Sequence, residues 1–416
     1  MLFLFEEKEK VMISKAAKKA ILIGSMCSLS YLAVYVAKNV LGPAVPGMVE
    51  SGTFTRELTT NMTSVYFIVY AVGQLINGYV GNFIPAKYMI SIGLFMAGVC
   101  HGAFSAADGA AIPSFLAYAA SGFFLSMIYG PMTRVVAENT EPIYATRCSI
   151  GYTFSSFFGT PLAGVIVALF IWRLAFAVSS AFLMLMGMIC FSVFTLFEKK
   201  GLVTYGKYKR AGGKGLDGLR VLLRHKIVKF TLISVLTGVV RTTVVYWFAS
   251  YANGYLGFSE KSSALIYSGA TFAFGFCTFI AIFVYERLGR DMDKTILLAF
   301  LSAALCFFGV YAVKAAWVNI ALLILAIISS NCASSMMWCR YCPGLRDTGM
   351  VSGVTGFLDF ISYMSASASN KIFDNAVDGI GWENLILVWL ALMVAGVIVA
   401  LPYDRILKRK TNEEIV

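Results

Sequence analysis

The sequence predicts an all-α membrane protein of twelve transmembrane helices in two pseudo-symmetric six-helix bundles, and three observations support this fold class. Of the 416 residues, 59% are hydrophobic and only 13% are charged, whereas soluble domains carry about 25% charged residues. Apolar runs of about 20 residues, the length that crosses a bilayer, follow one another along the chain. One long polar stretch divides these runs into two groups of six. The runs are too long and continuous for barrel strands.

The expected helices follow from the positions of these apolar runs. In order along the chain, they cover residues 17–41, 60–82, 87–107, 111–136, 146–170, 172–196, 227–252, 262–286, 293–313, 316–339, 348–371 and 382–403. The polar stretch between the sixth and seventh helices is rich in lysine and arginine. We therefore expect an N-terminal bundle at residues 1–196, a basic cytoplasmic linker at residues 197–226 and a C-terminal bundle at residues 227–416.

Lysine and arginine are distributed unequally between the two sides of the expected membrane. With both termini in the cytoplasm, 26 of the 34 lie on the cytoplasmic side, five lie outside and three lie within the membrane. Cytoplasmic loops of membrane proteins carry such an excess of positive charge. An odd number of crossings would place one basic terminus outside. We therefore expect a multi-pass protein of the cytoplasmic (plasma) membrane, surrounded by lipid, with both termini cytoplasmic.

Several other functions lack the residues that they need. The net charge of +12 is spread between apolar runs rather than gathered on one patch, so nucleic acid is not an expected partner. The chain has only two histidines, and the CxxC at Cys339 and Cys342 has no second pair beside it. No Walker lysine motif, dinucleotide-binding turn or Ser–His–Asp set is found. We expect no enzymatic activity, no cofactor and no metal, and a monomeric protein.

An internal repeat places one cation at a similar depth in the first helix of each half. Lys38 lies 16 residues before Phe54, which opens Phe-Thr-Arg-Glu, and Arg241 lies 17 residues before Phe258, which opens Phe-Ser-Glu-Lys. Membrane proteins built from repeated halves bind their ligands near the midplane, between the halves. Because a charge within the membrane normally faces a cavity or a partner, the two cations predict a site for an anion.

The alternative is that each cation is structural and pairs with a carboxylate nearby. Acidic residues within the expected spans are scarce: Glu138 and Glu286 lie near helix ends, and Asp359 lies inside the eleventh helix. One carboxylate cannot neutralise both cations. Asp359 could carry a proton, or it could pair with Lys38 or Arg241 in one state of a cycle.

Two rows of hydrogen-bonding side chains lie on the first two helices, each at the spacing of one helical face. They are Tyr31, Tyr35 and Lys38 on the first helix, and Tyr66, Tyr70 and Gln74 on the second. Tyrosine hydroxyls and a glutamine amide can donate hydrogen bonds to anionic oxygens. Packing is the alternative role for each tyrosine, but both rows beside Lys38 favour binding.

These segments resemble the organophosphate:phosphate antiporter family of the major facilitator superfamily, the glycerol-3-phosphate and hexose-phosphate transporters. The resemblance is strongest in residues 35–58 (YVAKNVLGPAVPGMVESGTFTREL), 239–263 (VVRTTVVYWFASYANGYLGFSEKSS) and 349–369 (GMVSGVTGFLDFISYMSASAS). It implies alternating access, with inorganic phosphate leaving as an organic phosphate enters. It also implies that Lys38 and Arg241 hold the phosphate group, beside Tyr31, Tyr35 and Tyr70.

The chain departs from that family at several of these positions. The first-helix cation is Lys38 rather than arginine, Gln74 stands where the family has lysine, and Thr271 stands where it has glutamate. The fifth-helix histidine has no counterpart. The site is therefore less cationic than in the family, so a monoanion such as a carboxylate or sugar acid, taken up with a proton, is the alternative cargo. A membrane sensor with a transporter fold is a further alternative.

Four residues are expected to serve coupling or gating: Asp359, Arg134, Glu286 and Arg287. Arg134 in the fourth helix could reach the cytoplasmic surface or relay conformational change. The superfamily's loop motif after the second helix is degraded here, with Asn82 in place of the helix-capping aspartate, whereas the matching loop of the second half keeps Glu286 and Arg287. Such loops hold one end of a bundle closed through ion pairs and helix-end dipoles. We expect the loop after the second helix to do so more weakly than the matching loop of the second half.

Overall fold

A computed structural model describes residues 14–107, 109–208 and 217–403 of the chain. The described residues form helices joined by short turns and contain no strand. Residues 209–216 of the expected linker, and the ends of both termini, lie outside the described residues.

The N-terminal half contains eight helical segments that build the first six expected crossings. They are α1 (Lys15–Asn39), α2 (Leu41–Glu50), α3 (Arg56–Val80), α4 (Ala86–Ala106), α5 (Ala111–Leu125), α6 (Tyr129–Asn139), α7 (Pro142–Leu169) and α8 (Trp172–Lys199). A short helix, α9 (Asp217–Arg224), precedes the second half. The fourth crossing is broken between α5 and α6, and α7 begins earlier than expected, directly after the turn at Glu141.

The C-terminal half builds the other six crossings, again with breaks inside several of them. Its segments are α10 (Ile227–Val239), the π-helix η1 (Val240–Val244), α11 (Val245–Gly254), α12 (Glu260–Phe274), α13 (Cys277–Arg287), α14 (Met292–Ala312), α15 (Ala316–Met336), the π-helix η2 (Met337–Tyr341), α16 (Cys342–Gly344), the 3-10 helix η3 (Arg346–Thr348) and α17 (Val351–Ala400). The last element, α17, contains two crossings that meet at Gly381, where φ is 75°. The predicted twelve-helix fold is confirmed.

The first crossing continues beyond its expected end because α2 follows α1 with almost no break. Pro43 does not interrupt α2, because it is the third residue of that helix. The first four backbone N–H groups of a helix have no intrahelical acceptor, so a proline there removes no hydrogen bond.

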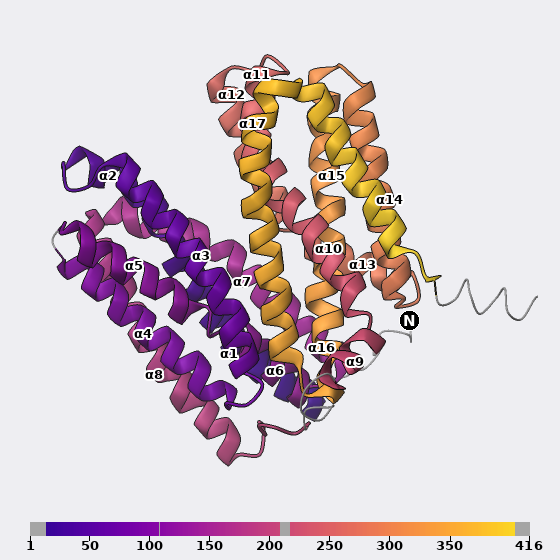
Figure 1. Cartoon of the computed structure of the whole chain (residues 1–416). Coiled ribbons are helices and arrows are strands. Elements are labelled where there is room, and N and C mark those ends of the chain that lie inside the picture. The colour runs from indigo at the N-terminus through magenta and orange to yellow at the C-terminus, as the bar shows by residue number, and fades with distance from the viewer. Residues whose placement is uncertain (1–13, 108, 209–216, 404–416) are drawn as a thin grey trace, which may run out of the picture.

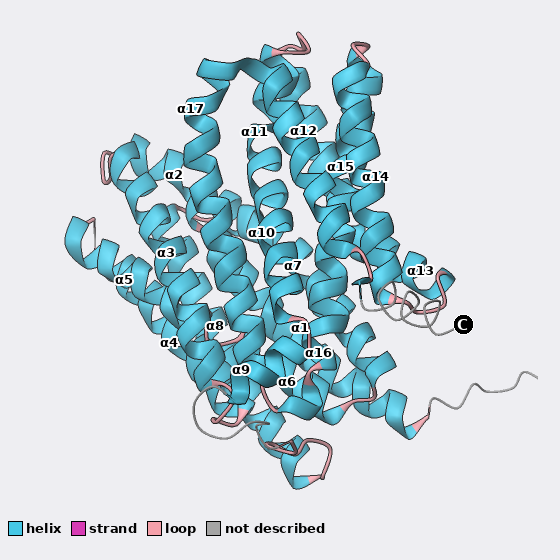
Figure 2. Cartoon of the chain, turned by 45° about the vertical axis from the view of Figure 1, so that its right-hand side comes forward, coloured by secondary structure: helices cyan, strands magenta, loops and turns pink. Residues whose placement is uncertain are grey.

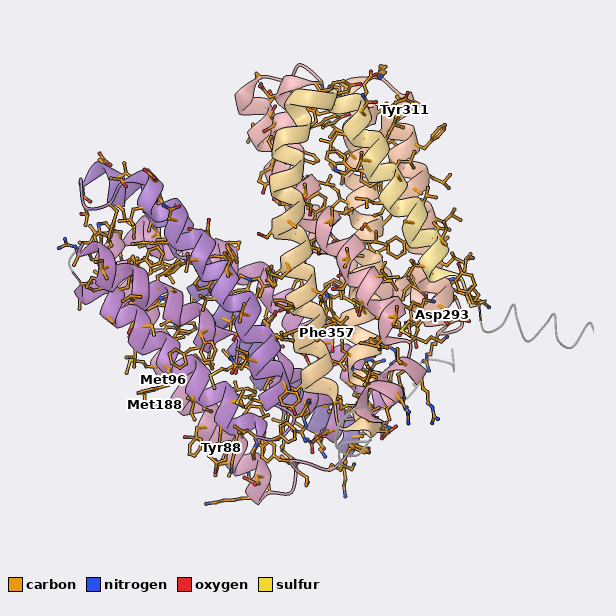
Figure 3. All side chains as sticks on the ribbon, viewed as in Figure 1. Tyr88, Met96, Met188, Asp293, Tyr311 and Phe357 are labelled. Carbon is orange, nitrogen blue, oxygen red and sulfur yellow. The ribbon has the colours of Figure 1, made fainter. Side chains whose placement is uncertain are left out.

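Eight helical spans of the described residues are long and apolar enough to cross a membrane by length and composition. The other expected crossings correspond to α3, α7, the η1-interrupted pair α10–α11 and the first part of α17. Large apolar side chains stay exposed on the outer faces, among them Leu116, Leu169 and Leu305. Figure 3 shows Met188, which is 52% exposed, on the outer face of α8. A bilayer would cover such a surface.

The two halves lie side by side and differ in separation at their two ends. We call the end near α9, where the turns at residues 81–85 and 345–350 lie, the linker end, and the other the distal end. In Figure 1 the halves meet at the linker end and diverge toward the distal end. Figure 2 shows α17 running beside α3 and α10, and α17 packs against both. The first part of α17 therefore lies at the boundary between the halves.

Candidate functional site

Lys38 lies in the last turn of α1 and points toward the boundary between the halves. Its Nζ atom donates a hydrogen bond to the Tyr363 hydroxyl of α17 at 2.5 Å. The same ammonium lies 4.4 Å from the ring centroid of Tyr70 and 5.3 Å from that of Phe67. The Tyr35 and Tyr363 rings are also within cation–π range. Aromatic faces stabilise a cation without neutralising it, so Lys38 keeps its charge available.

Arg241 reaches the same region from the other half. It lies in the π-helix η1, where the seventh crossing loses its α-helical register, and such bulges are frequent at functional sites. Its Nη2 atom is 3.4 Å from the Ser362 hydroxyl, and its guanidinium carbon is 6.0 Å from the Tyr363 ring centroid. Among the described residues, neither Arg241 nor Lys38 has a carboxylate within 4 Å.

Tyr363 is the residue of this site that the sequence analysis missed. It extends from the first part of α17 and contacts both cations, with its hydroxyl toward Lys38 and its ring toward Arg241. Its ring also packs edge-on against Tyr70, with centroids 5.5 Å apart. A signal was present, because Tyr363 follows Asp359 by four residues and so shares its helical face.

Asp359 is the carboxylate of this group, and it is 7% exposed. It interacts electrostatically with both Arg241 and Lys38, but it forms no direct ion pair with either. The arrangement in which each cation has its own carboxylate is therefore not the one observed. Asp359 is an internal counter-charge that the two cations share.

The predicted tyrosine and glutamine residues divide into two groups. Tyr35 and Tyr70 lie against Lys38. Tyr31 instead packs on Tyr129, with ring centroids 5.2 Å apart. Gln74 donates a hydrogen bond to the Tyr70 hydroxyl at 2.8 Å. Tyr31 and Gln74 thus support the residues around Lys38 rather than contact it.

A cavity of about 530 Å³ lies between the halves beside this cluster. Its walls include Tyr35, Thr153 and Pro161 from the N-terminal half and Arg241, Thr278 and Asn331 from the C-terminal half. Small-molecule sites typically have volumes of about 300–1,000 Å³, so a ligand of sugar size would fit. Within the described residues, His, Cys, Asp and Glu side chains do not gather in a group that could hold a metal.

The family model described as Major Facilitator Superfamily matches residues 27–367, which is most of the chain. The chain belongs to the major facilitator superfamily. Comparison with curated protein sequences gives no match. As a member of this superfamily, the chain is a membrane transporter.

Three solved structures of transporters share the fold of this superfamily member at low sequence identity. The proton:xylose symporter XylE bound to 6-bromo-6-deoxy-D-glucose is 13% identical, with a TM-score of 0.69 over 92% of this chain and 95% of that chain. A bacterial homologue of the iron transporter ferroportin, in an outward-facing state, is 14% identical, with a TM-score of 0.69 over 92% and 99% of the two chains. The transporter FucP in its outward conformation is 14% identical, with a TM-score of 0.72 over 92% and 98%.

The linker end of this transporter is closed by contacts between the halves. Asn82, in the turn after α3, accepts a hydrogen bond from the backbone N–H of Gly353 in the first turn of α17 at 3.0 Å. Arg340 donates to the Thr146 hydroxyl at 2.8 Å and to the Pro142 carbonyl at 3.1 Å. Arg346 donates to the Thr140 carbonyl at 3.4 Å. These bonds connect the ends of α3, α6 and α7 to the C-terminal half.

The predicted gating residues occupy different environments. Arg134 is 7% exposed, pairs with Glu138 at 2.7 Å and donates to the Gly81 carbonyl at 2.9 Å. It therefore holds the turn that carries Asn82 rather than reaching the surface. Glu286 and Arg287 are exposed at the end of α13, where Arg287 lies over the Phe283 ring at 5.1 Å. The gating roles expected for Arg134, Glu286 and Arg287 stay predictions.

We expect Asn82→Ala to weaken the closure of the linker end. Loss of a capping side chain costs about 0.5–2 kcal/mol, and here the cap joins the two halves, so the equilibrium should shift toward a linker-end-open state. Alkylation of a cysteine introduced at Ala145, which lines the same pocket as Arg340 and Arg346, should become several-fold faster. The matched control is Ser259→Ala, since Ser259 caps α12 within one half through Ser262. Equal alkylation rates in both variants would show that the degraded loop motif has no latching role.

Proposed function

We propose that this transporter moves a small organic anion by alternating access, and that this anion is a phosphate ester exchanged for inorganic phosphate. The observation that carries the proposal is the convergence of Lys38 and Arg241, one from each half, on Tyr363 without a direct ion pair to any described carboxylate. Ionisable residues within the membrane normally mark a substrate or ion pathway. The phosphate ester is suggested by the family that the sequence resembles.

The charges near the cavity favour an anion over a neutral or cationic cargo. With Asp359 ionised, its charge and those of the half-buried Lys38 and Arg241 sum to one positive charge, and with Asp359 protonated they sum to two. A bound anion would add favourable interactions with both cations in a water-poor environment. Arg241 also offers a planar fork that matches the oxygens of a phosphate or carboxylate group.

Alternating access requires that the contacts at the linker end break when the distal end closes. The described contacts are hydrogen bonds from Asn82, Arg340 and Arg346 and the packing of α3 against the first part of α17. All of them join one half to the other, so the opening of this end need not disrupt either bundle. If the linker end is cytoplasmic, as the distribution of lysine and arginine predicts, this structure is the state with its cavity toward the outside.

The position of Asp359 favours a second candidate function, proton-coupled symport of a sugar acid or another carboxylate. Asp359 interacts electrostatically with both cations and could lose its proton when the cargo leaves. With Asp359 ionised, the remaining single positive charge would suit a monoanion better than a dianion.

We expect a counterflow experiment to separate these two modes. Purified protein in liposomes preloaded with phosphate should take up labelled glycerol 3-phosphate several-fold faster than in liposomes preloaded with chloride. The reason is that the binding site of an exchanger turns back to the outside faster with phosphate bound than when it is empty. A protonophore should leave this uptake unchanged. Uptake of a sugar acid that needs an imposed proton gradient, with no acceleration by internal phosphate, would support symport instead.

A further inference from the structure

The wall of the cavity formed by α13 and α15 carries uncharged polar side chains close to Arg241. Thr278 extends from α13, and Asn331, Ser334 and Ser335 extend from α15, and all four line the same 530 Å³ cavity as Arg241. The Thr278 and Ser335 hydroxyls are 3.0 Å apart, which connects the two helices. The cavity therefore has one charged side and one side that offers hydroxyl and amide groups.

Asn331 is the member of this wall that lacks a partner. Its side chain is 7% exposed, and its Oδ1 atom is buried without a hydrogen bond. Leaving a buried polar group unpaired costs about 1–3 kcal/mol, and Asn331 lines the cavity, so a ligand that reaches this amide would supply the missing hydrogen bond. The amide can accept and donate hydrogen bonds, which a hydroxyl group of a ligand can match in both directions.

The neighbouring hydroxyl groups can also form hydrogen bonds with a ligand. The Ser334 hydroxyl accepts a hydrogen bond from Trp338 Nε1 at 3.0 Å, which leaves its proton available to a ligand. Of the pair formed by Thr278 and Ser335, one hydroxyl donates to the other, and the second proton has the Cys277 sulfur, 3.9 Å from both oxygens, or a ligand as its acceptor. This wall presents both donors and acceptors but no charge, which suits sugar or polyol hydroxyls rather than a second anionic group.

We propose that Thr278, Asn331, Ser334 and Ser335 form a hydroxyl subsite that binds the uncharged part of the cargo, while Arg241 and Lys38 hold its anionic group. This inference rests on the proposed function, and it narrows the cargo to an anion that carries several hydroxyl groups, such as a phosphorylated polyol or sugar or a sugar acid. A simple alkyl anion would leave Asn331 unpaired and would bind less tightly.

The test compares ligands that have the same charge but differ in their hydroxyl groups. Purified wild-type protein in detergent is titrated by calorimetry with glycerol 3-phosphate and with propyl phosphate, and in parallel with gluconate and with hexanoate. We expect the hydroxylated member of at least one pair to bind tenfold or more tightly than its partner. The Asn331→Leu variant should lose most of that preference while its affinity for propyl phosphate or hexanoate changes less than twofold.

A second variant covers the case in which Asn331→Leu fails to fold. Ser335→Ala removes one hydroxyl with little change in volume and should reduce the preference by severalfold. Binding of both members of a pair with equal affinity would overturn the hydroxyl subsite but leave the anion site intact. If none of the four anions binds, the proposed function itself fails, and the subsite fails with it.

Discussion

Arg241→Ala is expected to abolish transport while the protein still inserts and folds. Arg241 is the cation that lines the cavity and faces Tyr363, so its removal takes away a direct partner of the anion. Truncating one partner of a buried charge pair costs about 2–5 kcal/mol, and about 1.4 kcal/mol corresponds to a tenfold change. Initial rates of anion uptake into liposomes should fall by a factor on the order of a hundred or more.

The control for this substitution is another arginine-to-alanine change, at a position outside the membrane. Arg224→Ala lies on the exposed helix α9 and should transport at the wild-type rate. Lys38→Ala should retain slightly more uptake than Arg241→Ala, because the Lys38 ammonium is already partly engaged by Tyr363 and the aromatic rings around it. Normal uptake by Arg241→Ala would remove the case for an anionic cargo.

Gly356→Ala is expected to hold the transporter away from its linker-end-closed state. A Cβ atom at Gly356 of α17 would lie 2.1 Å from the Gln74 carbonyl oxygen and 2.7 Å from the Gly78 Cα atom of α3. Both are backbone atoms that no side-chain rotation can move, so the two helices must separate. Overpacking of this kind costs about 1–3 kcal/mol, which corresponds to a shift of roughly five- to 150-fold between the two states.

Spin labels can report this shift because the linker ends of both halves carry exposed positions. Labels at Tyr88 on α4 and Lys294 on α14 lie in different halves, near the end where Figure 3 labels Tyr88 and Asp293. Their distance should increase in Gly356→Ala, and uptake should fall. Gly164→Ala is the matched control, since a Cβ atom there meets nothing within 4 Å. An unchanged distance with normal uptake would show that the close approach of α3 and α17 is not required.

Much of the site could be predicted because the two halves repeat one pattern. The matching depths of Lys38 and Arg241 located a cation in each half. Helical spacing on α1 placed Tyr35 near Lys38, and the family resemblance suggested Tyr70, and both rings lie within cation–π range of Lys38. Helical spacing describes contacts along one helix, whereas Tyr363 meets Lys38 across 325 positions of sequence. The partner that joins the two cations therefore could not be found from either repeat alone.

The loop after α3 shows a similar limit. The replacement of aspartate by asparagine at Asn82 suggested a weakened motif. Asparagine and aspartate cap helices about equally well, and Asn82 accepts the Gly353 N–H of the other half. Whether a cap closes the linker end depends on which backbone N–H it meets, and a loop sequence does not contain that information.

Hydrophobicity, charge distribution and internal repeats are properties of the chain, so they were enough to predict the membrane fold, the two bundles and the two half-buried cations. How the halves meet depends instead on packing between segments far apart in the chain. The close packing of Gly78 against Gly356 sets the position of α17 beside α3, and that position brings Tyr363 to Lys38 and Asp359 near both cations. The physical reason is that the position of α17 along α3 is set by the steric fit of two backbones far apart in the chain. Hydrophobic patterning predicts only where each helix lies in the sequence and which of its faces is apolar.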